Sequence, residues 1–96
     1  MNILVAYDVN TQSKEGARRL RKVAKICEGF GQRVQDSVFE CSIGLTDMER
    51  FRIRLLKVIV TQEDSLRIYK LPSNREEVVE VHGRDLYIDL SDPLII

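Results

Sequence analysis

Residues 2–8 have the sequence NILVAYD, a short apolar run rich in β-forming residues that ends at an acidic side chain. Such a run is typical of a strand that is buried on both faces in the middle of a sheet. A polar loop at residues 10–13 follows, and Ser13 can cap a helix. Helical spacing predicts the buried face of this helix, which consists of Ala17, Leu20, Ala24 and Cys27.

The next stretch of the chain predicts two more strands. Gly29 and Gly31 favour a left-handed end for the first helix, because glycine adopts that conformation most easily. Residues 32–35 then start a second strand, and Asp36-Ser37 predicts a tight turn. Residues 38–43 alternate between two faces and predict a third strand.

A second helix and a fourth strand follow. Residues 46–49 match a capping box, so a helix is expected to start there and to continue to about Thr61. Its apolar positions keep helical spacing and are Met48, Phe51, Leu55 and Val58. Residues 66–69 mark the fourth strand, which residues 71–74 end.

The predicted order is strand, helix, strand, strand, helix, strand. Two helices then pack on one face of an antiparallel sheet, which is a ferredoxin-like α+β fold. We expect a single domain over residues 1–96, with this core at about 1–71. Strand-like patterns at 78–82 and 86–90 exceed what the core requires, so the segment at about 78–96 is expected to pair with a second copy and seal a homodimer. The alternative is that this segment folds onto the edge strand of its own chain.

The composition of the 96-residue chain, 44% hydrophobic and 31% charged, is that of a globular protein. No apolar run approaches the roughly 20 residues that span a bilayer, so we expect a cytoplasmic protein with no membrane partner. Cys27 and Cys41 do not form a C-x-x-C pair and only one histidine exists, which excludes a zinc site, a disulfide framework and catalysis by paired histidines within one chain. The two cysteines are expected to be buried, and His82 to pair with Glu80 or Asp85.

Charge is distributed unevenly, although the net charge is zero. Residues 14–33 contain seven basic and two acidic side chains, a net +5, and residues 76–92 contain six acidic and one basic, a net −5. A local field of this kind can attract a polyanion. One face of the first helix has four cations with no acid between them, which favours phosphate binding; these are Lys14, Arg18, Arg21 and Lys25. Arg33 can extend this patch, and the alternative is an ordinary solvated helix face.

Asp8 places a carboxylate at the end of the predicted central strand. Carboxylate oxygens are ligands that suit Mg²⁺ or Mn²⁺. The alternative is that Asp8 only caps the turn that follows the strand.

Six stretches of the sequence, in chain order, carry a family resemblance. They are residues 6–9 (AYDV), 19–25 (RLRKVAK), 31–35 (GQRVQ), 37–40 (SVFE), 64–69 (DSLRIY) and 92–96 (DPLII). Together they resemble the small CRISPR-associated nuclease family that accompanies the CRISPR integrase in spacer acquisition, and the last stretch is similar to the branch that accompanies type I-C systems. The resemblance covers the whole chain and implies a ferredoxin-like homodimer whose C-terminal strands cross to the partner.

The resemblance also implies a chemistry. Asp8 of each protomer would face its mate across the two-fold axis and, as the catalytic residue, hold a divalent ion for phosphodiester cleavage. Tyr7, Arg33, Ser37 and Phe39 would line the same cleft. Members of the family cut RNA or double-stranded DNA, and the alternative role is a non-catalytic dimeric DNA-binding scaffold of the integrase complex. A small-ligand regulatory domain on the same fold is a third class, but the sequence contains no clustered polar pocket for it.

The paired Asp8 side chains can be treated with elementary electrostatics. Two carboxylates about 4 Å apart repel by about 4 kcal/mol at an effective dielectric constant of about 20. A proton or a cation must therefore lie between them. One ion with two protein ligands is a sparse site, so weak metal affinity and low turnover are expected.

Overall fold

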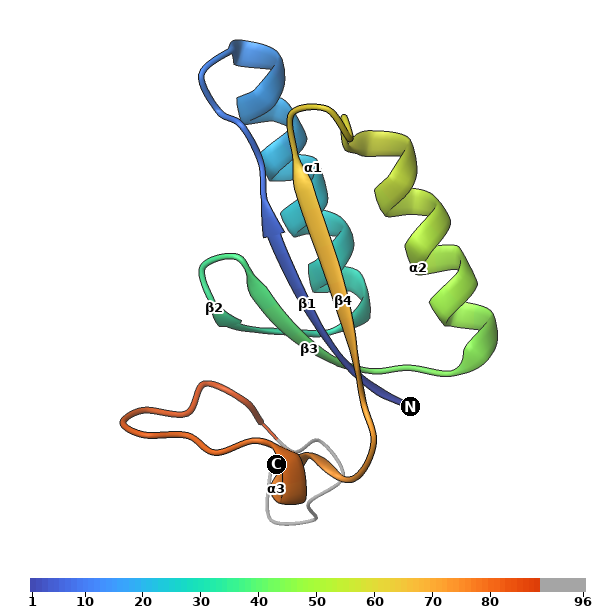
Figure 1. Cartoon of the computed structure of the whole chain (residues 1–96), viewed down its shortest axis with the longest axis vertical. Helices are drawn as coiled ribbons and strands as arrows, with labels where there is room; N and C mark the ends of the chain where they lie inside the picture. Colours follow the sequence, from blue (N-terminus) through green and yellow to red (C-terminus); the bar gives the residue numbers. More distant parts are fainter. Residues whose placement is uncertain (89–96) are drawn as a thin grey trace.

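The computed structural model describes residues 1–88 of the chain (Figure 1). Over these residues seven elements follow one another: β1 (Asn2–Asp8), α1 (Lys14–Phe30), β2 (Gln32–Gln35), β3 (Val38–Ser42), α2 (Leu45–Val58), β4 (Ser65–Leu71) and α3 (Arg75–Val78). The strands form one antiparallel sheet in the order β2-β3-β1-β4, so β1 is a central strand, as predicted. The chain is thus a small α+β fold.

Alternation along β1 determines which face of the sheet belongs to the core. Ile3, Val5 and Tyr7 are buried on the side where Figure 1 shows α1 and α2, whereas Leu4 and Ala6 point to the other face and are half-buried. Burial of β1 on both faces, which the apolar run predicted, is therefore wrong for the described chain. The helices cover the middle of one face, and the other face is called the outward face below.

The core lies between the sheet and the two long helices. The helices contribute Val23, Ile26, Cys27, Met48, Phe51 and Leu55. The positions predicted for α2 are correct, since the first three are buried and Val58 is half-buried against them. In α1 only Cys27 of the predicted positions is fully buried, and the stripe is centred on Val23 and Ile26. Burying a side chain such as Phe51 contributes about 1.5–3 kcal/mol.

The two long helices begin in different ways. The Gly16 amide donates a 3.0 Å hydrogen bond to Ser13 Oγ, which confirms Ser13 as the cap of α1. By contrast, α2 begins at Leu45 behind Gly44, which makes no side-chain capping bond. The capping box predicted at residues 46–49 is therefore wrong, because these residues already lie within the first turn. The helix also ends at Val58, short of the predicted Thr61, because residues 61–63 form a turn.

Gly31 ends α1 in an extended conformation, with φ of −161°, so the predicted left-handed end is wrong. Among the described residues only Gly83 has a positive φ. Gly31 is instead required for close packing: a Cβ there would collide with Cys41 Sγ and lie 2.6 Å from the carbonyl oxygen of Glu40. The absence of a side chain lets the chain turn directly from α1 into β2.

The chain beyond β4 departs from the prediction. Val78 is the last residue of α3, and residues 79–88, called the C-terminal segment below, contain no strand. The strand predicted at 78–82 is therefore wrong for the described chain, and part of the strand predicted at 86–90 lies outside the described residues. A strand needs a neighbouring backbone to pair with, and the Ile88 backbone pairs with the side chain of Gln32 instead.

None of the helices formed by residues 1–88 is long and apolar enough to cross a membrane.

Candidate functional site

Asp8 is an exposed side chain at one end of the sheet. It is the last residue of β1 and pairs with Ser65, the first residue of β4. The position predicted for it, at the end of a central strand, is thus correct. Because neighbouring residues of a strand point to opposite faces, Asp8 lies on the outward face and Tyr7 on the helix side. The Asp8 carboxylate is therefore open to a ligand or to a second copy of the chain.

Four residues predicted to line a cleft near Asp8 contact one another on the helix side. The rings of Tyr7 and Phe39 stack with centroids 6.2 Å apart, and the guanidinium of Arg33 lies 5.2 Å from the Phe39 centroid. The Tyr7 amide donates a 3.1 Å hydrogen bond to the carbonyl oxygen of Ser37. The structure thus brings Tyr7, Arg33, Ser37 and Phe39 together, but within one chain Asp8 points to the opposite face of the sheet.

Only part of this group can meet a ligand directly. Phe39 has no exposed surface and Tyr7 is 6% exposed, whereas Arg33 is exposed and Ser37 is half-buried. Burial is the main cause of a raised pKa for the Tyr7 hydroxyl, so this side chain stays protonated at neutral pH. In the described chain, Tyr7 and Phe39 therefore support Arg33, an exposed member of the group whose Nη2 lies 3.5 Å from Glu28 Oε1. A phosphate that contacts Arg33 would compete with this ion pair.

A buried carboxylate lies close behind Asp8. Asp64 accepts hydrogen bonds from the Asn10 amide (3.1 Å) and the Val60 amide (2.9 Å). Arg19 binds the same carboxylate with two nitrogens, at 2.9 Å from Nε and 3.2 Å from Nη2. The Asp64 side chain has no exposed surface and that of Arg19 is 13% exposed. The hydrogen bond from Arg19 is the main cause that lowers the pKa of Asp64 below its ordinary value.

We refer to the Asp64 carboxylate, the Arg19 guanidinium and the backbone amides of Asn10 and Val60 as the Asp64–Arg19 clamp. Sequence reasoning did not single out Asp64, although aspartate in a turn commonly accepts backbone amides. That signal would have suggested the nearby Val60 amide. It could not have suggested Asn10, which is 54 residues away in the chain.

The basic face of α1, formed by Lys14, Arg18, Arg21 and Lys25, is exposed as predicted. Across residues 1–88 none of these four cations takes part in an ion pair. Arg18, Arg21 and Lys25 line one shallow depression together with Lys22. The neighbouring Arg19 differs from them because it turns inward to Asp64. The face therefore offers a row of unpaired positive charge to a polyanion.

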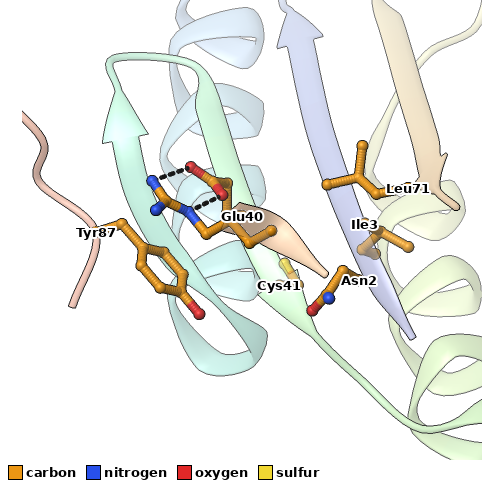
Figure 2. Close-up of a pocket in the computed structure, with 7 residues that line it drawn as sticks. Asn2, Ile3, Glu40, Cys41, Leu71 and Tyr87 are labelled. Carbon is orange, nitrogen blue, oxygen red and sulfur yellow. Dashed lines mark hydrogen bonds and ion pairs between the residues drawn. The ribbon is translucent and has the colours of Figure 1, made fainter. Parts of the chain in front are cut away.

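A second buried carboxylate lies toward the other end of the sheet. Glu40 of β3 is bound by Arg75 of α3 through two nitrogens, at 2.5 Å from Nε and 3.2 Å from Nη2. Glu40 and Arg75 line a small pocket, and Figure 2 shows Glu40 within it. The pocket has a volume of about 10 Å³, which is room for roughly one water molecule. The pocket is therefore too small to be a ligand site.

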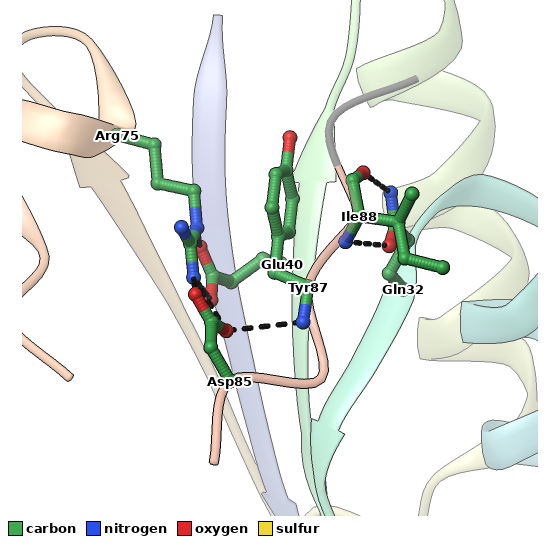
Figure 3. A network of polar contacts seen from close by, with 6 residues as sticks. All are labelled: Gln32, Glu40, Arg75, Asp85, Tyr87 and Ile88. Atoms are coloured by element: carbon green, nitrogen blue, oxygen red, sulfur yellow. Dashed lines mark hydrogen bonds and ion pairs between the residues drawn. The ribbon is translucent and has the colours of Figure 1, made fainter. Parts of the chain in front are cut away.

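Arg75 also ties down the C-terminal segment (Figure 3). Its Nη2 donates to both carboxylate oxygens of Asp85 at 3.0 Å, and its guanidinium lies 4.0 Å from the centroid of the Tyr87 ring. Further along, the Gln32 amide group donates to the Ile88 carbonyl at 2.7 Å and accepts from the Ile88 amide at 2.8 Å. We name Glu40, Arg75 and Asp85 together the Glu40–Arg75 clamp, and it attaches the C-terminal segment to β3.

The remaining candidate chemical groups are accounted for. Cys27 and Cys41 are buried, and burial raises the pKa of their thiols to about 12 and about 11. Neither is therefore a nucleophile at neutral pH. His82 lies on the surface with Nε2 2.6 Å from Glu80, which confirms the predicted pairing. Within residues 1–88, no three His, Cys, Asp or Glu side chains are grouped so that they could hold a metal ion.

A family model described as CRISPR associated protein Cas2 matches residues 1–79. The chain is 47% identical over 96 residues to "CRISPR-associated endoribonuclease Cas2 1" of Moorella thermoacetica, covering 100% of both chains. It is 50% identical over 95 residues to "CRISPR-associated endonuclease Cas2" of Halalkalibacterium halodurans, covering 99% of both chains.

Its fold is also similar to that of a solved structure. The crystal structure of Streptococcus pyogenes Cas2 at pH 6.5 matches it with a TM-score of 0.77 and 47% identity, over 86% of this chain and 100% of that chain. The family model and the two relatives show that the chain belongs to the Cas2 family of CRISPR-associated proteins.

Proposed function

We propose that this chain is a CRISPR-associated endonuclease that hydrolyses phosphodiester bonds in RNA or double-stranded DNA with a divalent metal. Two relatives that match nearly its whole length are named endoribonuclease and endonuclease. The observation that carries the proposal is the exposed Asp8 carboxylate at the end of the central strand. The buried thiols and the surface pairing of His82 leave no competing catalytic group of those types among the described residues.

We further propose that the active form is a homodimer of ferredoxin-like units, with residues 78–96 crossing to the partner. The outward face of the sheet supports this, because Leu4 and Ala6 are only half-buried there. Large apolar side chains of the C-terminal portion are also exposed, namely Val78, Val81, Leu86 and Ile88. Light scattering should then report about twice the chain mass of 11.1 kDa, and a monomer at working concentration would contradict the dimer.

The dimer would complete a metal site that one chain leaves incomplete. A single described chain supplies Asp8 without two further ligating side chains nearby, so the oxygen ligands would come from Asp8 of both copies. Carboxylate oxygens fit Mg²⁺ or Mn²⁺. A bound ion would neutralise phosphoryl charge and lower the pKa of a water nucleophile. The task of the protein is then to hold two like-charged carboxylates in place.

The basic face of α1 would bind the nucleic-acid backbone without base specificity. Replacing its four cations by glutamine should lower the salt dependence of duplex binding by about 0.9 in log K per decade of salt for each phosphate that the protein no longer neutralises. The matched control neutralises four cations of α2, namely Arg50, Arg52, Arg54 and Lys57. If the slope of log K against log salt is unchanged in the α1 variant, the basic face of α1 is an ordinary solvated face.

The catalytic proposal is tested with Asp8→Asn, which keeps the size of the side chain and removes its charge. Wild type and variant are purified identically and assayed on RNA and on duplex DNA with Mg²⁺, Mn²⁺ or chelator. We expect the variant to lose cleavage and keep the dimer, because the repulsion between the two carboxylates is gone. Asp36→Asn is the matched control, since Asp36 is also exposed at a strand end. Equal cleavage by wild type and Asp8→Asn would contradict the proposal.

The second candidate is a non-catalytic scaffold that binds DNA beside the CRISPR integrase in the cytoplasm. It is favoured by the unpaired basic face of α1 and by the single ligating side chain that each described chain offers at Asp8. Absence of cleavage by the wild type, together with intact salt-dependent DNA binding, would select it. In either role we propose the branch that accompanies type I-C systems, on the ending at residues 92–96, which lies outside the described residues.

A further inference from the structure

We propose that Asp64 and Arg19 are positioning residues that hold Asp8 in its working place. The proposal rests on the proposed function, because it assigns these residues to the same site. Neither side chain would touch the substrate. They would act through the backbone of residues 8–10.

The first step of the argument is the connection from Asp64 to Asp8. Asp8 pairs with Ser65, and Ser65 directly follows Asp64 in the chain. Two residues after Asp8, the Asn10 amide donates to Asp64 at 3.1 Å. The backbone of residues 8–10 is thus held at Asp8 by the β1–β4 pairing and at Asn10 by the Asp64 carboxylate.

The second step is the strength of this attachment. The Asp64 side chain has no exposed surface, which strengthens its hydrogen bonds relative to those of a carboxylate in water. Arg19 holds both oxygens of the carboxylate, and such bidentate charged pairs have a fixed geometry. The Val60 amide adds a third attachment, from the turn that follows α2. Three separate parts of the chain therefore meet at Asp64, and none can shift without breaking a hydrogen bond to this carboxylate.

The third step is the packing on the other side of the loop. A Cβ at Gly16 would collide with the carbonyl oxygen of Asn10, so this loop lies directly against the first turn of α1. The Asn10 side chain also accepts a 3.0 Å hydrogen bond from the Gln12 amide. Asn10 is thus held by Asp64 through its amide and enclosed by Gly16 at its carbonyl oxygen.

Such rigidity has a chemical use at a site that needs two carboxylates close together. Their repulsion would drive a mobile loop apart, whereas a loop fixed on both sides cannot retreat. Misplacement of a catalytic group by about 1 Å can reduce the rate by about a hundredfold. A buried clamp behind the carboxylate prevents that displacement without adding charge to the site itself.

The test uses the full-length protein with Asp64→Asn and a matched control, Glu40→Gln. Both substitutions turn a buried, arginine-bound carboxylate into an amide of similar size. The control pairs with Leu4, about 13 Å along β1 from Asp8 at 3.3 Å per residue. Arg19→Lys is a milder third variant, which keeps the charge and loses the two-nitrogen geometry. All are assayed at a temperature where each is fully folded by circular dichroism.

For Asp64→Asn we expect amide hydrogen exchange at Asn10 in the metal-free protein to rise about tenfold or more. The turnover number should fall about tenfold to a hundredfold. Glu40→Gln should leave the exchange at Asn10 within about twofold of wild type, and Arg19→Lys should lie between. Equal effects of Asp64→Asn and Glu40→Gln on Asn10 exchange, or unchanged turnover of Asp64→Asn, would overturn the proposal.

The exchange measurement separates this proposal from the proposed function. If the wild type cleaves nothing, the nuclease proposal fails, and the clamp is judged on the exchange of the Asp8 and Asn10 amides alone. Faster exchange in Asp64→Asn then still supports the clamp, and unchanged exchange overturns it. If Asp64→Asn does not fold, Arg19→Lys decides by the same two readouts.

Discussion

Two buried carboxylates, each held by an arginine through two nitrogens, lie at different places along the same sheet. Asp64 and Glu40 have side chains that are 0% and 7% exposed, and their arginine partners are 13% and 15% exposed. The chemistry of the two pairs is thus nearly identical. Their surroundings differ, because Asp64 also accepts two backbone amides, whereas within residues 1–88 Glu40 is bound by Arg75 alone.

The two arginines also differ in their other acidic partners. Besides Asp64, Arg19 lies within ion-pair distance of Glu63, with a closest N–O distance of 3.8 Å, whereas Arg75 binds Asp85 at 3.0 Å. The Asp64–Arg19 clamp therefore joins parts of the folded core, and no equivalent partner could replace it. The Glu40–Arg75 clamp attaches the C-terminal segment. Asp85 of that segment is a second carboxylate that binds Arg75. The comparison teaches that the same kind of ion pair can join loops and a helix in one place and attach the C-terminal segment to the sheet in another.

The largest expected effect is on the free energy of unfolding. Asp64→Ala leaves a buried guanidinium and two amides without their partner, and breaking a buried pair in this way costs about 3–5 kcal/mol. Glu40→Ala should cost less, about 1–3 kcal/mol, because Arg75 keeps Asp85. Urea unfolding at one fixed protein concentration measures both. A larger loss for Glu40→Ala would reverse the comparison.

Alanine substitutions at two glycines should sharpen the comparison of the two clamps. Gly16 lies against Asn10 beside the first clamp, and Gly31 lies against Glu40 beside the second. Alanine at either position forces overpacking, with an expected loss of about 1–3 kcal/mol. Gly29→Ala is the control on the same helix, since a Cβ there meets nothing within 4 Å, and it should stabilise the protein by up to about 1 kcal/mol. Unchanged stability of Gly16→Ala would show that its loop can move.

Acid should weaken the first clamp. The folded-state pKa of Asp64 is lowered, chiefly by the hydrogen bond from Arg19. A lowered pKa contributes stability that is present above the unfolded value of about 3.9 and is lost as the pH falls through the folded value. The melting temperature of the wild type should therefore fall below about pH 4 more steeply than that of Asp64→Asn. Parallel pH profiles of the two proteins would contradict this role of the carboxylate.

The smallest expected effect concerns the attachment of the C-terminal segment. Asp85 is partly exposed and its pKa is lowered, first by the hydrogen bond from the Tyr87 amide and then by Arg75. Asp85→Asn should reduce stability only slightly, as is usual for exposed ion pairs. Amide exchange should rise at Tyr87 and stay unchanged at Asn10. A rise at Asn10 would mean that the two clamps are coupled.

Sequence patterns correctly predicted the elements whose structure depends on residues close together in the chain. The apolar alternation of residues 38–43 and the helical spacing from Met48 to Leu55 placed β3 and the buried face of α2 correctly. The start of α2 was missed because Gly44 makes no side-chain cap for a sequence pattern to show. The strand predicted at 78–82 did not form because its partner edge is not specified by its own residues.

In the candidate site, too, the sequence predicted the local feature and missed the long-range contact. The position of Asp8 follows from the run of residues 2–8, and its exposure follows from the end of that strand. The partnership of Asp64 with Asn10 joins residues 54 positions apart. No periodic pattern encodes such a pairing, because it exists only after the helices have packed on the sheet.

The two buried cysteines have a practical consequence for spectroscopy. With thiol pKa values of about 12 and about 11, only about one molecule in 10⁴ to 10⁵ presents either native thiolate at pH 7. Maleimide dyes and spin labels, which react with the thiolate, should therefore react only very slowly with Cys27 and Cys41. A cysteine introduced at an exposed position such as Thr11 should be labelled selectively, without first replacing Cys27 or Cys41.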